Sequence, residues 1–384
     1  MGYKQVDFNT EDVSGYSTIQ ATQENGERRS TNKAFLAPVR KHRKNLTVVT
    51  NIRVVKLLID QNTQRANGIE YILEHKRNIR GTILAKKEVI LSAGAFNTPQ
   101  ILMLSGIGPE ETLSSLGIPV IKNLKVGYNL QDHHMSPGVF ISLDKKSQTI
   151  PNDQSIHLDA YEYFVGNRKR SPFASVGPSH TLINMRTKYA EDSYPDLQIY
   201  FIPVMLCAKA SYPICYYDQI NYQPLLLKPK SRGRVTINTT DPFAPPVIYP
   251  NYFQNHRDID VYLESYRFAE TLKSNRVFQE AGFYVNTTFR PSREDFLTGN
   301  NPIWKNPKSG FGFSICHPSC TCKMGPAGDP EAVVDPKLKI HGIDNLRVVD
   351  ASAMPTITSG PINAPIIMIA EKASDIIKSH WNKK

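Results

Sequence analysis

The C-terminal part of the sequence places a short apolar run, a carboxylate and a helix start in close succession. The run Leu346-Arg347-Val348-Val349 ends at Asp350, which predicts a short buried strand with a carboxylate at its end. Asn363-Ala364-Pro365 predicts a helix start, because the N–H that proline lacks would be an orphan at the first helical position. Apolar residues recur at helical spacing from Ile366 to Ile377, so we expect one buried helix face. Such a helix N-terminus can hold a polar cofactor ring and stabilise negative charge on it.

A histidine lies upstream on a sulfur-rich segment, Cys316-His317-Pro318-Ser319-Cys320-Thr321-Cys322, which we interpret as an irregular loop. Its cysteines and histidine suggest zinc, but structural zinc sites usually use well-separated cysteine pairs such as two C-x₂-C units. The spacing here is C-x₃-C-x-C, and the sequence has no second cluster. We therefore predict no metal site.

Three further stretches and this C-terminal segment form an ordered set of motifs. The motifs are Gly94–Gly108, Val126–His133, Pro229–Val235 and Cys316–Pro365. Together they resemble the glucose-methanol-choline (GMC) flavin oxidoreductases, and most of all the insect glucose dehydrogenase-like members. The matches run in family order from about Gly15 to Ile377, which makes them far more specific than one glycine pattern.

The resemblance implies an α/β fold (α+β overall), with an incomplete FAD-binding Rossmann-like domain plus an antiparallel-sheet substrate domain with helices. We expect the remaining part of the FAD-binding domain at 1–137, the substrate domain at 138–305 and a C-terminal return to the FAD-binding domain at 306–384. Family members begin with a G-x-G-x-x-G turn that holds the pyrophosphate. The sequence contains no such turn, because Gly106-Ile107-Gly108 ends a predicted helix and no third glycine follows. We therefore expect an N-terminally truncated member.

The chemistry that the resemblance implies is FAD-dependent oxidation of an alcohol or sugar hydroxyl, with electrons passed to a quinone-like acceptor or oxygen. By resemblance, His317 is the base that takes the hydroxyl proton, a role that suits a side chain with a pKa near neutrality. The backbone of Val54 would meet the adenine of FAD. The other positions beside the cofactor are Asp350, Ala351, Asn363, Ala364 and Pro365, the last three at a helix N-terminus that faces the flavin pyrimidine.

The sequence departs from the family pattern at two positions. Cys320 replaces a glycine, which places a side chain where the backbone is expected to need positive φ or a close approach. The family's second catalytic position, usually Asn or His, falls on Pro361, which has no side-chain donor or acceptor. These departures leave a second hypothesis open, a truncated or degenerate non-catalytic protein with the GMC fold and no flavin.

Local patterns predict several elements. A β meander should use Leu46–Thr50, Val54–Ile59 and Ala66–Ile72, and Thr98 should cap a helix that begins at Pro99. In Asp132-His133-His134 the adjacent histidines point to opposite faces of an extended chain, so we expect a surface or domain-junction role. The remaining predicted elements are strands at Glu88–Gly94, Asp196–Ile202 and Arg234–Asn238 and a helix at Asp258–Lys273.

Composition narrows the possible partners. The net charge of +11 is spread along the chain, and we interpret its sharpest basic cluster, Arg40-Lys41-His42-Arg43-Lys44, as a solvated turn and not a nucleic-acid site. No apolar run approaches the roughly 18 residues of a membrane span. Glycosylation sequons at Asn45, Asn238 and Asn286 matter only in a secreted protein, and secretion of the full-length form is an expectation from the family.

Overall fold

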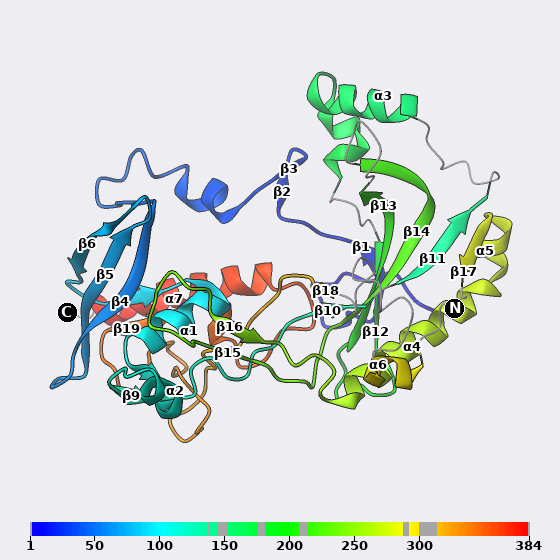
Figure 1. Cartoon of the computed structure of the whole chain (residues 1–384). Helices are drawn as coiled ribbons and strands as arrows, with labels where there is room; N and C mark the ends of the chain where they lie inside the picture. Colours follow the sequence, from blue (N-terminus) through cyan, green and yellow to red (C-terminus); the bar gives the residue numbers. More distant parts are fainter. Residues whose placement is uncertain are drawn as a thin grey trace. The chain divides into compact units, whose positions relative to one another are not determined.

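A computed structural model of the protein describes residues 2–136, 138–144, 153–175, 181–206, 214–286, 292–298 and 313–382 (Figure 1). The chain divides into two compact units. Unit 1 comprises Met1–Val48, His134–Leu227 and His256–Phe313. Unit 2 comprises Val49–His133, Lys228–Asn255 and Ser314–Lys384.

Unit 1 is built on a large, mainly antiparallel sheet whose order is β1-β12-β13-β14-β10-β18, with β11 paired to both β14 and β17. Its strands are β1 (Gly15–Thr18), β10 (His134–Met135), β11 (Val139–Leu143), β12 (Thr181–Met185), β13 (Leu197–Leu206), β14 (Ile214–Leu226), β17 (Phe283–Asn286) and β18 (Phe313–Ser314). A separate hairpin pairs β2 (Gln23–Glu24) with β3 (Glu27–Arg28). The helices of unit 1 are α3 (Asp153–Phe164), α4 (His256–Lys273), α5 (Arg276–Glu280) and α6 (Arg293–Thr298). Three shorter helical segments are η1 (Asn32–Leu36), η2 (Arg168–Arg170) and η3 (Pro172–Ala174).

Helix α4 covers the sheet of unit 1 through a row of buried aromatic residues. Tyr222 of β14 is fully buried, and its hydroxyl donates to the carbonyl of Ser265 in α4 at 2.7 Å. Tyr262 and Tyr266 of α4 are buried as well. The prediction of a helix at Asp258–Lys273 is confirmed, and so is the predicted strand that became β13.

Unit 2 combines a three-stranded antiparallel sheet, β4-β5-β6, with small two-stranded sheets and three helices (Figure 1). Its elements are β4 (Ile52–Asp60), β5 (Arg65–Leu73), β6 (Lys76–Leu84), β7 (Val89–Leu91), α1 (Gly94–Leu104), β8 (Ile107–Gly108), α2 (Glu110–Ser115), β9 (Lys122–Asn123), β15 (Arg234–Thr236), β16 (Val247–Tyr249), β19 (Leu346–Val348), η4 (Ala351–Ala353) and α7 (Asn363–Trp381). β7 and β19 pair in parallel, with Val89 opposite Leu346, although they lie more than 250 residues apart. The predicted strands before Gly94 and before Asp350 are therefore confirmed, and they are neighbours.

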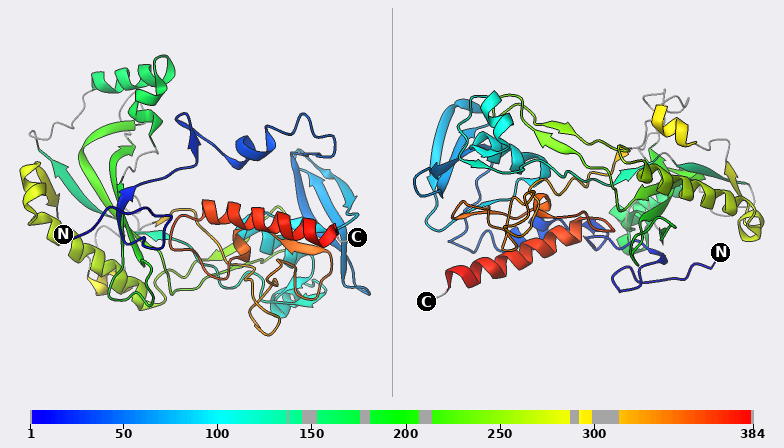
Figure 2. Two further views of the ribbon diagram at one scale, coloured as in Figure 1. Left: turned by 180° about the vertical axis from the view of Figure 1, so that it is seen from behind. Right: turned by 90° about the horizontal axis from the view of Figure 1, so that it is seen from below.

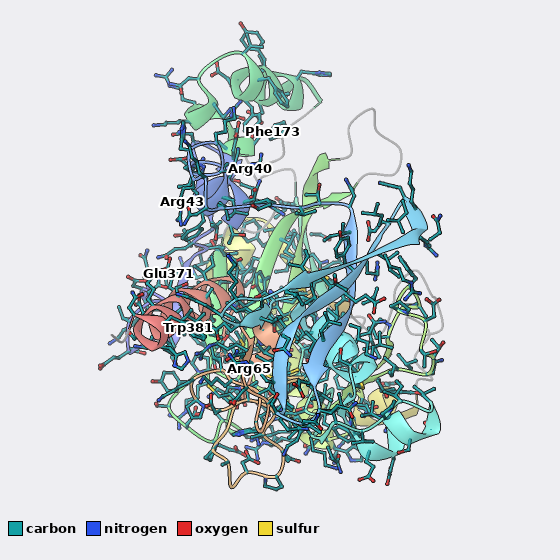
Figure 3. All side chains as sticks on the ribbon, turned by 90° about the vertical axis from the view of Figure 1, so that its left-hand side faces the viewer. Arg40, Arg43, Arg65, Phe173, Glu371 and Trp381 are labelled. Atoms are coloured by element: carbon teal, nitrogen blue, oxygen red, sulfur yellow. The ribbon has the colours of Figure 1, made fainter. Side chains whose placement is uncertain are left out.

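The predicted meander is correct in two of its strands and wrong in the first. β4 and β5 contain Val54–Ile59 and Ala66–Ile72, but Leu46–Thr50 forms no strand. Val48 and Val49 are exposed, so these β-branched residues bury nothing against a partner strand. The third strand is instead β6, a charged segment that pairs along β5 with its side chains mostly exposed. The basic cluster at Arg40–Lys44 is an exposed turn, as predicted (Figure 3).

Helix α1 begins earlier than predicted. It starts at Gly94, so Thr98 is not its N-cap and Pro99 lies inside the helix. Pro99 cannot donate to the carbonyl of Ala95 one turn earlier. The hydroxyl of Thr321 fills that gap by donating to the Ala95 carbonyl at 2.7 Å. The predicted stop is correct, because the helix ends before Gly106, whose φ is +83°.

Helix α7 runs from Asn363 to Trp381 (Figure 2). It begins within the predicted segment but two residues earlier than expected, so Pro365 is the third helical residue and not the first. Its buried face is narrower than the pattern indicated. Ala373 is the fully buried residue, Ile366 and Ile369 are half-buried, and Ala370 is exposed. Across the segments that the structure describes, none of the helices has both the length and the apolar character needed to cross a lipid bilayer.

The predicted domain boundaries differ from the two units at two places and stay a prediction. Residues 1–48 group with unit 1, because β1 pairs with β12 from Gly15 to Thr18. Residues 228–255 group with unit 2, because the amide of Val235 donates to the Gly127 carbonyl at 2.7 Å. No local sequence pattern predicts the pairing of β1 with β12 or the hydrogen bond between Val235 and Gly127.

Unit 1 contains a buried histidine that makes its stability sensitive to acid. Burial lowers the pKa of His134 to about 4, whereas the unfolded chain titrates near 6.5. As the pH falls below 6.5 the unfolded state gains a proton that the folded state gains only near 4, so stability is lost across that window. We expect a loss on the order of 3 kcal/mol from this residue between pH 6.5 and 4, measured by urea unfolding.

Replacing His134 with glutamine should reduce the slope of the unfolding free energy against pH by the contribution of about one proton. His75→Gln is the matched control, because His75 is exposed in the turn between β5 and β6. An unchanged slope in the His134 variant would show that other groups cause the acid sensitivity.

Candidate active site

The histidine loop of unit 2 is held by a buried carboxylate. The amide of His317 donates to Oδ1 of Asp132 at 3.0 Å, and the hydroxyl of Tyr252 donates to Oδ2. Asp132 is 8% exposed, and burial raises the pKa of its carboxyl although these hydrogen bonds oppose the rise. Two residues of the loop, Cys316 and Cys320, adopt positive φ values of +61° and +74°. The expectation that position 320 needs a glycine-like backbone is therefore confirmed.

The imidazole of His317 lies against a second histidine. Its Nδ1 is 2.9 Å from Nδ1 of His133, and the ring centroids are 5.1 Å apart with an interplanar angle of 71°. Nε2 of His133 lies 3.1 Å from the carbonyl oxygen of Thr358. Burial lowers the pKa of His317 to about 4, so its ring is neutral at physiological pH. A neutral imidazole can accept a proton, which is what a general base requires.

Asp350 organises the turn that follows β19. Its Oδ1 accepts from the amide and the hydroxyl of Ser352, while Oδ2 accepts from the amide of Gly94 at 2.9 Å and the hydroxyl of Thr98 at 2.6 Å. Both oxygens are thus occupied by protein donors, and Asp350 joins the end of β19 to the start of α1. Ala351 follows as a buried residue at the start of η4.

We expect Asp350→Asn to destabilise unit 2 by about 2–3 kcal/mol, because the amide would turn an N–H₂ group toward donors that the carboxylate accepts. Urea unfolding of both proteins measures the difference. Ser352→Ala is the matched control, since it removes one of the hydrogen bonds and should cost about 1 kcal/mol. Equal stability of Asp350→Asn and the wild type would show that this network does not hold the turn.

The loop of His317 and the turn at Asp350 are bound to each other by backbone hydrogen bonds. The amide of Cys320 donates to the carbonyl of Ala351 at 3.0 Å, and the amide of Cys322 donates to that of Ser352 at 2.8 Å. Cys320 and Ala351 also belong to a small buried cluster against which Ile366 of α7 packs. The structure therefore brings together His317, Asp350, Ala351 and the first turns of α7.

The N-terminus of α7 is accessible. Asn363 and Ala364 are exposed and Pro365 is half-buried. The preceding residue, Ile362, provides no side-chain cap, and the first turn contains no acidic residue. Neither Ile362 nor the first turn of α7 therefore supplies a carboxylate that would offset the positive end of the helix dipole. Pro361 is exposed beside it.

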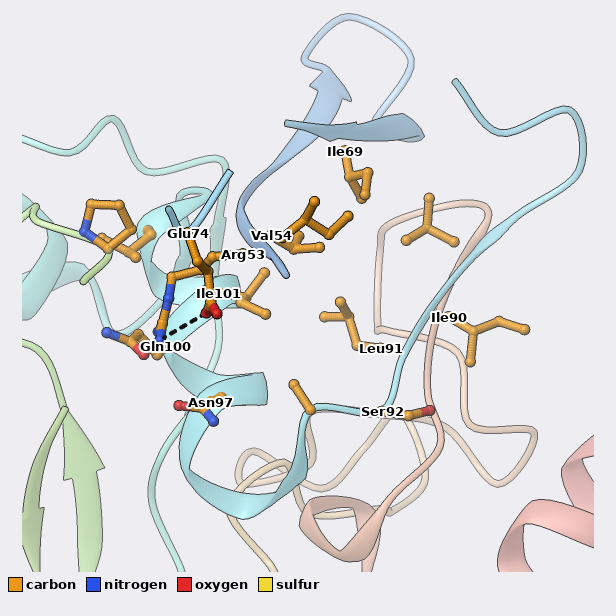
Figure 4. Close-up of a pocket in the computed structure, with 15 residues that line it drawn as sticks. Arg53, Val54, Ile69, Glu74, Ile90, Leu91, Ser92, Asn97, Gln100 and Ile101 are labelled. Carbon is orange, nitrogen blue, oxygen red and sulfur yellow. Dashed lines mark ion pairs between the residues drawn. The ribbon is translucent and has the colours of Figure 1, made fainter. Parts of the chain in front are cut away.

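Val54 lies apart from this cluster, in a cavity of about 460 Å³ (Figure 4). The cavity extends from β4 to Ser92 and Ala93, just before Gly94. A Cβ built on Gly94 would meet nothing within 4 Å, so space is open at this turn as well. The wall includes Arg53, paired with Glu74 at 3.6 Å, and its buried Nε has no hydrogen-bond partner among the described residues.

Sequence reasoning missed the role of Asp132 and His133. The structure places them where the chain passes from unit 2 to unit 1, which agrees with a domain junction, but they are buried and not at the surface. His133 is 0% exposed and contacts His317. The motif Val126–His133 was a signal that this segment matters, but it did not indicate which loop the histidine meets.

The cysteines of the histidine loop do not assemble a metal site within the described part of the chain, where no three His, Cys, Asp or Glu side chains converge. Cys320 and Cys322 are fully buried. Burial raises the pKa of the Cys320 thiol to about 12 and that of Cys322 as well, so both remain protonated.

Comparisons with known proteins identify relatives along the whole chain. Sequence profiles of the GMC oxidoreductases match residues 1–135 and 229–370. Glucose dehydrogenase [FAD, quinone] of Drosophila melanogaster is 33% identical over 391 residues, covering 100% of this chain and 61% of that protein. The oxygen-dependent choline dehydrogenase of Staphylococcus haemolyticus is 35% identical over 383 residues, covering 98% of this chain and 64% of that protein. The chain thus spans less than two thirds of the length of these curated relatives.

Solved structures show the same fold. Pyridoxine 4-oxidase from Mesorbium loti superposes with a TM-score of 0.77 at 25% identity, covering 100% of this chain and 68% of that one. A formate oxidase variant from Aspergillus oryzae RIB40 gives 0.78 at 25% identity, covering 99% and 68%. The predicted fold class and the family resemblance are both confirmed. The chain belongs to the GMC oxidoreductase family.

Proposed function

We propose that the protein takes part in FAD-dependent oxidation of an alcohol or sugar hydroxyl, with His317 as the base that receives the hydroxyl proton. The observation that carries this proposal is the neutral, half-buried imidazole of His317, bound through its loop to the turn at Asp350. Family membership and the printed names of the relatives support the reaction class.

The residues of unit 2 fit an FAD molecule in chemical character. Val54 lines a cavity of the size that small-molecule sites have, and Gly94 leaves its backbone open to a close approach. Ala351 and the uncapped start of α7, from Asn363 through Ala364 to Pro365, would adjoin the ring system. The carboxylate of Asp350 already accepts four hydrogen bonds from the protein. Asp350 would therefore support the cofactor site by holding the backbone of its turn in place. When bound, FAD would supply the two-electron acceptor for the substrate's hydride.

Residues of this chain would accept the hydroxyl proton of the substrate and stabilise the negative charge that develops. His317 would take the hydroxyl proton as the C–H bond breaks. Its lowered pKa keeps it unprotonated at neutral pH, but also makes it a weaker base than a histidine whose pKa lies near neutrality. The positive end of α7 would stabilise negative charge that develops beside it. The side chain of Pro361 has no donor or acceptor, so it cannot serve as a second proton-handling group.

The finer assignments are part of the same proposal. The substrate would be a small alcohol or sugar, and the electrons would pass to a quinone-like acceptor or to oxygen, as the names of the relatives suggest. We also propose secretion. Asn45 and Asn238 are exposed at their sequons, so glycans would fit there, whereas the sequon at Asn286 extends beyond the described residues. Mass analysis after enzymatic glycan removal from protein secreted by insect cells tests this.

The test of the function is anaerobic mixing of the FAD-loaded protein with glucose, choline and simple alcohols. Loss of the visible flavin band on mixing, followed by its return with a quinone or oxygen, is the expected result. A stable flavin band with every substrate class would contradict the proposal.

The alternative is a non-catalytic protein with the GMC fold and no flavin. One observation favours it, the exposed Pro361 at the position where the family's second catalytic residue is expected. A folded protein that takes up no FAD would support this alternative.

A further inference from the structure

We propose that His133 is a positioning residue that fixes the tautomer of His317, so that Nδ1 of His317 carries the proton and Nε2 is the atom that accepts a proton from substrate. The tautomer follows from the hydrogen bonds of His133 together with its burial, which favours a neutral ring. Its catalytic consequence rests on the function proposed above.

The carbonyl of Thr358 determines which ring nitrogen of His133 carries the proton. A carbonyl oxygen can only accept, so Nε2 of His133, 3.1 Å away, must carry a proton. A neutral imidazole has one N–H, which leaves Nδ1 of His133 as an acceptor. The contact of 2.9 Å between the two Nδ1 atoms needs one proton, and His317 must supply it. Nε2 of His317 then has a free lone pair.

The opposite arrangement would require a charged ring at His133. If both nitrogens of His133 donated, Nδ1 of His317 would accept and its proton would sit on Nε2, which would disable it as a base there. His133 is fully buried, and burial disfavours an imidazolium. The carboxylate of Asp132 accepts from the amides of His317 and His133 and from the side chains of Tyr252 and Ser314. The neutral pair is therefore the favoured state.

The two rings are held in place by the backbone, not only by each other. The segment 131–133 runs against 315–319, with amide–carbonyl bonds between Gln131 and Ser319 in both directions at 3.2 and 2.9 Å. On the other side of His317, the amide of Ile315 donates to the His133 carbonyl at 3.2 Å. The backbone of His317 thus lies between two anchored positions, which keeps residue 317 beside His133.

The expected fall in kcat follows from the free energy that one hydrogen bond between neutral groups contributes. Losing the acceptor at His133 should lower the fraction of His317 protonated at Nδ1, and with it kcat, by about five- to tenfold. KM should change little, because the side chain of His133 is fully buried and not available to contact substrate. A role confined to folding would instead lower the yield of active protein and leave the tautomer of the folded fraction unchanged.

The direct test is nitrogen-15 NMR of the full chain with labelled histidine, in which protonated and unprotonated ring nitrogens have well-separated shifts. A spectrum of His317→Ala identifies the His317 signals by difference. We expect a protonated Nδ1 and an unprotonated Nε2 for His317 in the wild type. A proton on Nε2 of His317 would overturn the proposal. This result needs neither flavin nor turnover, so it is independent of the proposed function.

Two substitutions test the cause. His133→Leu removes the acceptor and should shift the His317 proton toward Nε2. His133→Asn keeps an oxygen near the position of Nδ1 and should retain the wild-type tautomer. In active preparations, His133→Leu should lower kcat about five- to tenfold with KM unchanged, and His133→Asn should recover most of the loss. Equal kcat in His133→Leu and the wild type would overturn the positioning role. Absence of turnover in the wild type would count against the proposed function, while the NMR result still decides the tautomer.

Discussion

Replacing His317 with alanine is expected to lower the turnover of alcohol by about 10²–10⁴-fold while leaving bound flavin in place, because general bases contribute rate enhancements of that order. The side chain is half-buried in a loop whose backbone is fixed independently by Asp132 and by hydrogen bonds from Cys320 and Cys322. Removing the imidazole should therefore remove the proton acceptor without displacing the turn at Asp350.

Turnover and flavin content of the same preparations measure this effect, with His75→Ala, an exposed histidine, as the control. The wild-type rate should be constant through neutral pH and fall as the pH drops through about 4, because the neutral imidazole is the active form and protonation there removes it. Turnover that survives in His317→Ala would exclude His317 as the base.

Arg347→Met is expected to destabilise unit 2 by about 3–5 kcal/mol, the usual cost of leaving one charge of a buried ion pair without its partner. Arg347 and Glu88 have side chains that are 1% and 5% exposed, with Nε and Oε2 2.7 Å apart. The same carboxylate accepts from Nε1 of Trp381 at 2.8 Å, which fixes the last turn of α7. Urea unfolding should therefore show a loss of stability. In a Trp304→Phe background, where Trp381 is the single tryptophan, fluorescence should report a loosened helix end.

A second substitution separates the charge effect from the loss of packing. Adding Glu88→Gln to Arg347→Met removes the stranded charge and keeps an acceptor for Trp381, so the double variant should recover part of the loss. Arg276→Met is the control, because Arg276 and Glu280 form an exposed pair that should contribute less than about 0.5 kcal/mol. If Arg347→Met costs no more than Arg276→Met, the buried pair does not stabilise the unit.

The elements that sequence reasoning predicted correctly are those whose signal is local. The strand before Asp350 and the start of α7 follow from an apolar run and from the Asn363-Ala364-Pro365 turn. The positive φ of Cys320 was predicted because family members place glycine there. The fold class followed from four ordered motifs and did not require any single contact to be known.

What the sequence did not reveal depends on contacts between distant segments. Thr98 was expected to cap a helix, but its hydroxyl donates to Asp350, 252 positions away. The strand expected at Leu46–Thr50 had the right residues and no partner. His133 meets His317 across 184 positions, through a backbone pairing that has no periodicity to detect. The role of His317 as the base stays a prediction, and so do the placements beside a cofactor of Val54, Asp350, Ala351, Asn363, Ala364 and Pro365.

The central claim is that the residues of unit 2 hold FAD for alcohol oxidation. The most direct test is a visible absorption spectrum of the purified chain after FAD is added and the unbound flavin is removed. The account predicts a flavin band that stays with the folded protein at about one FAD per chain. A protein that unfolds cooperatively, and is therefore folded, yet retains no flavin band would contradict it.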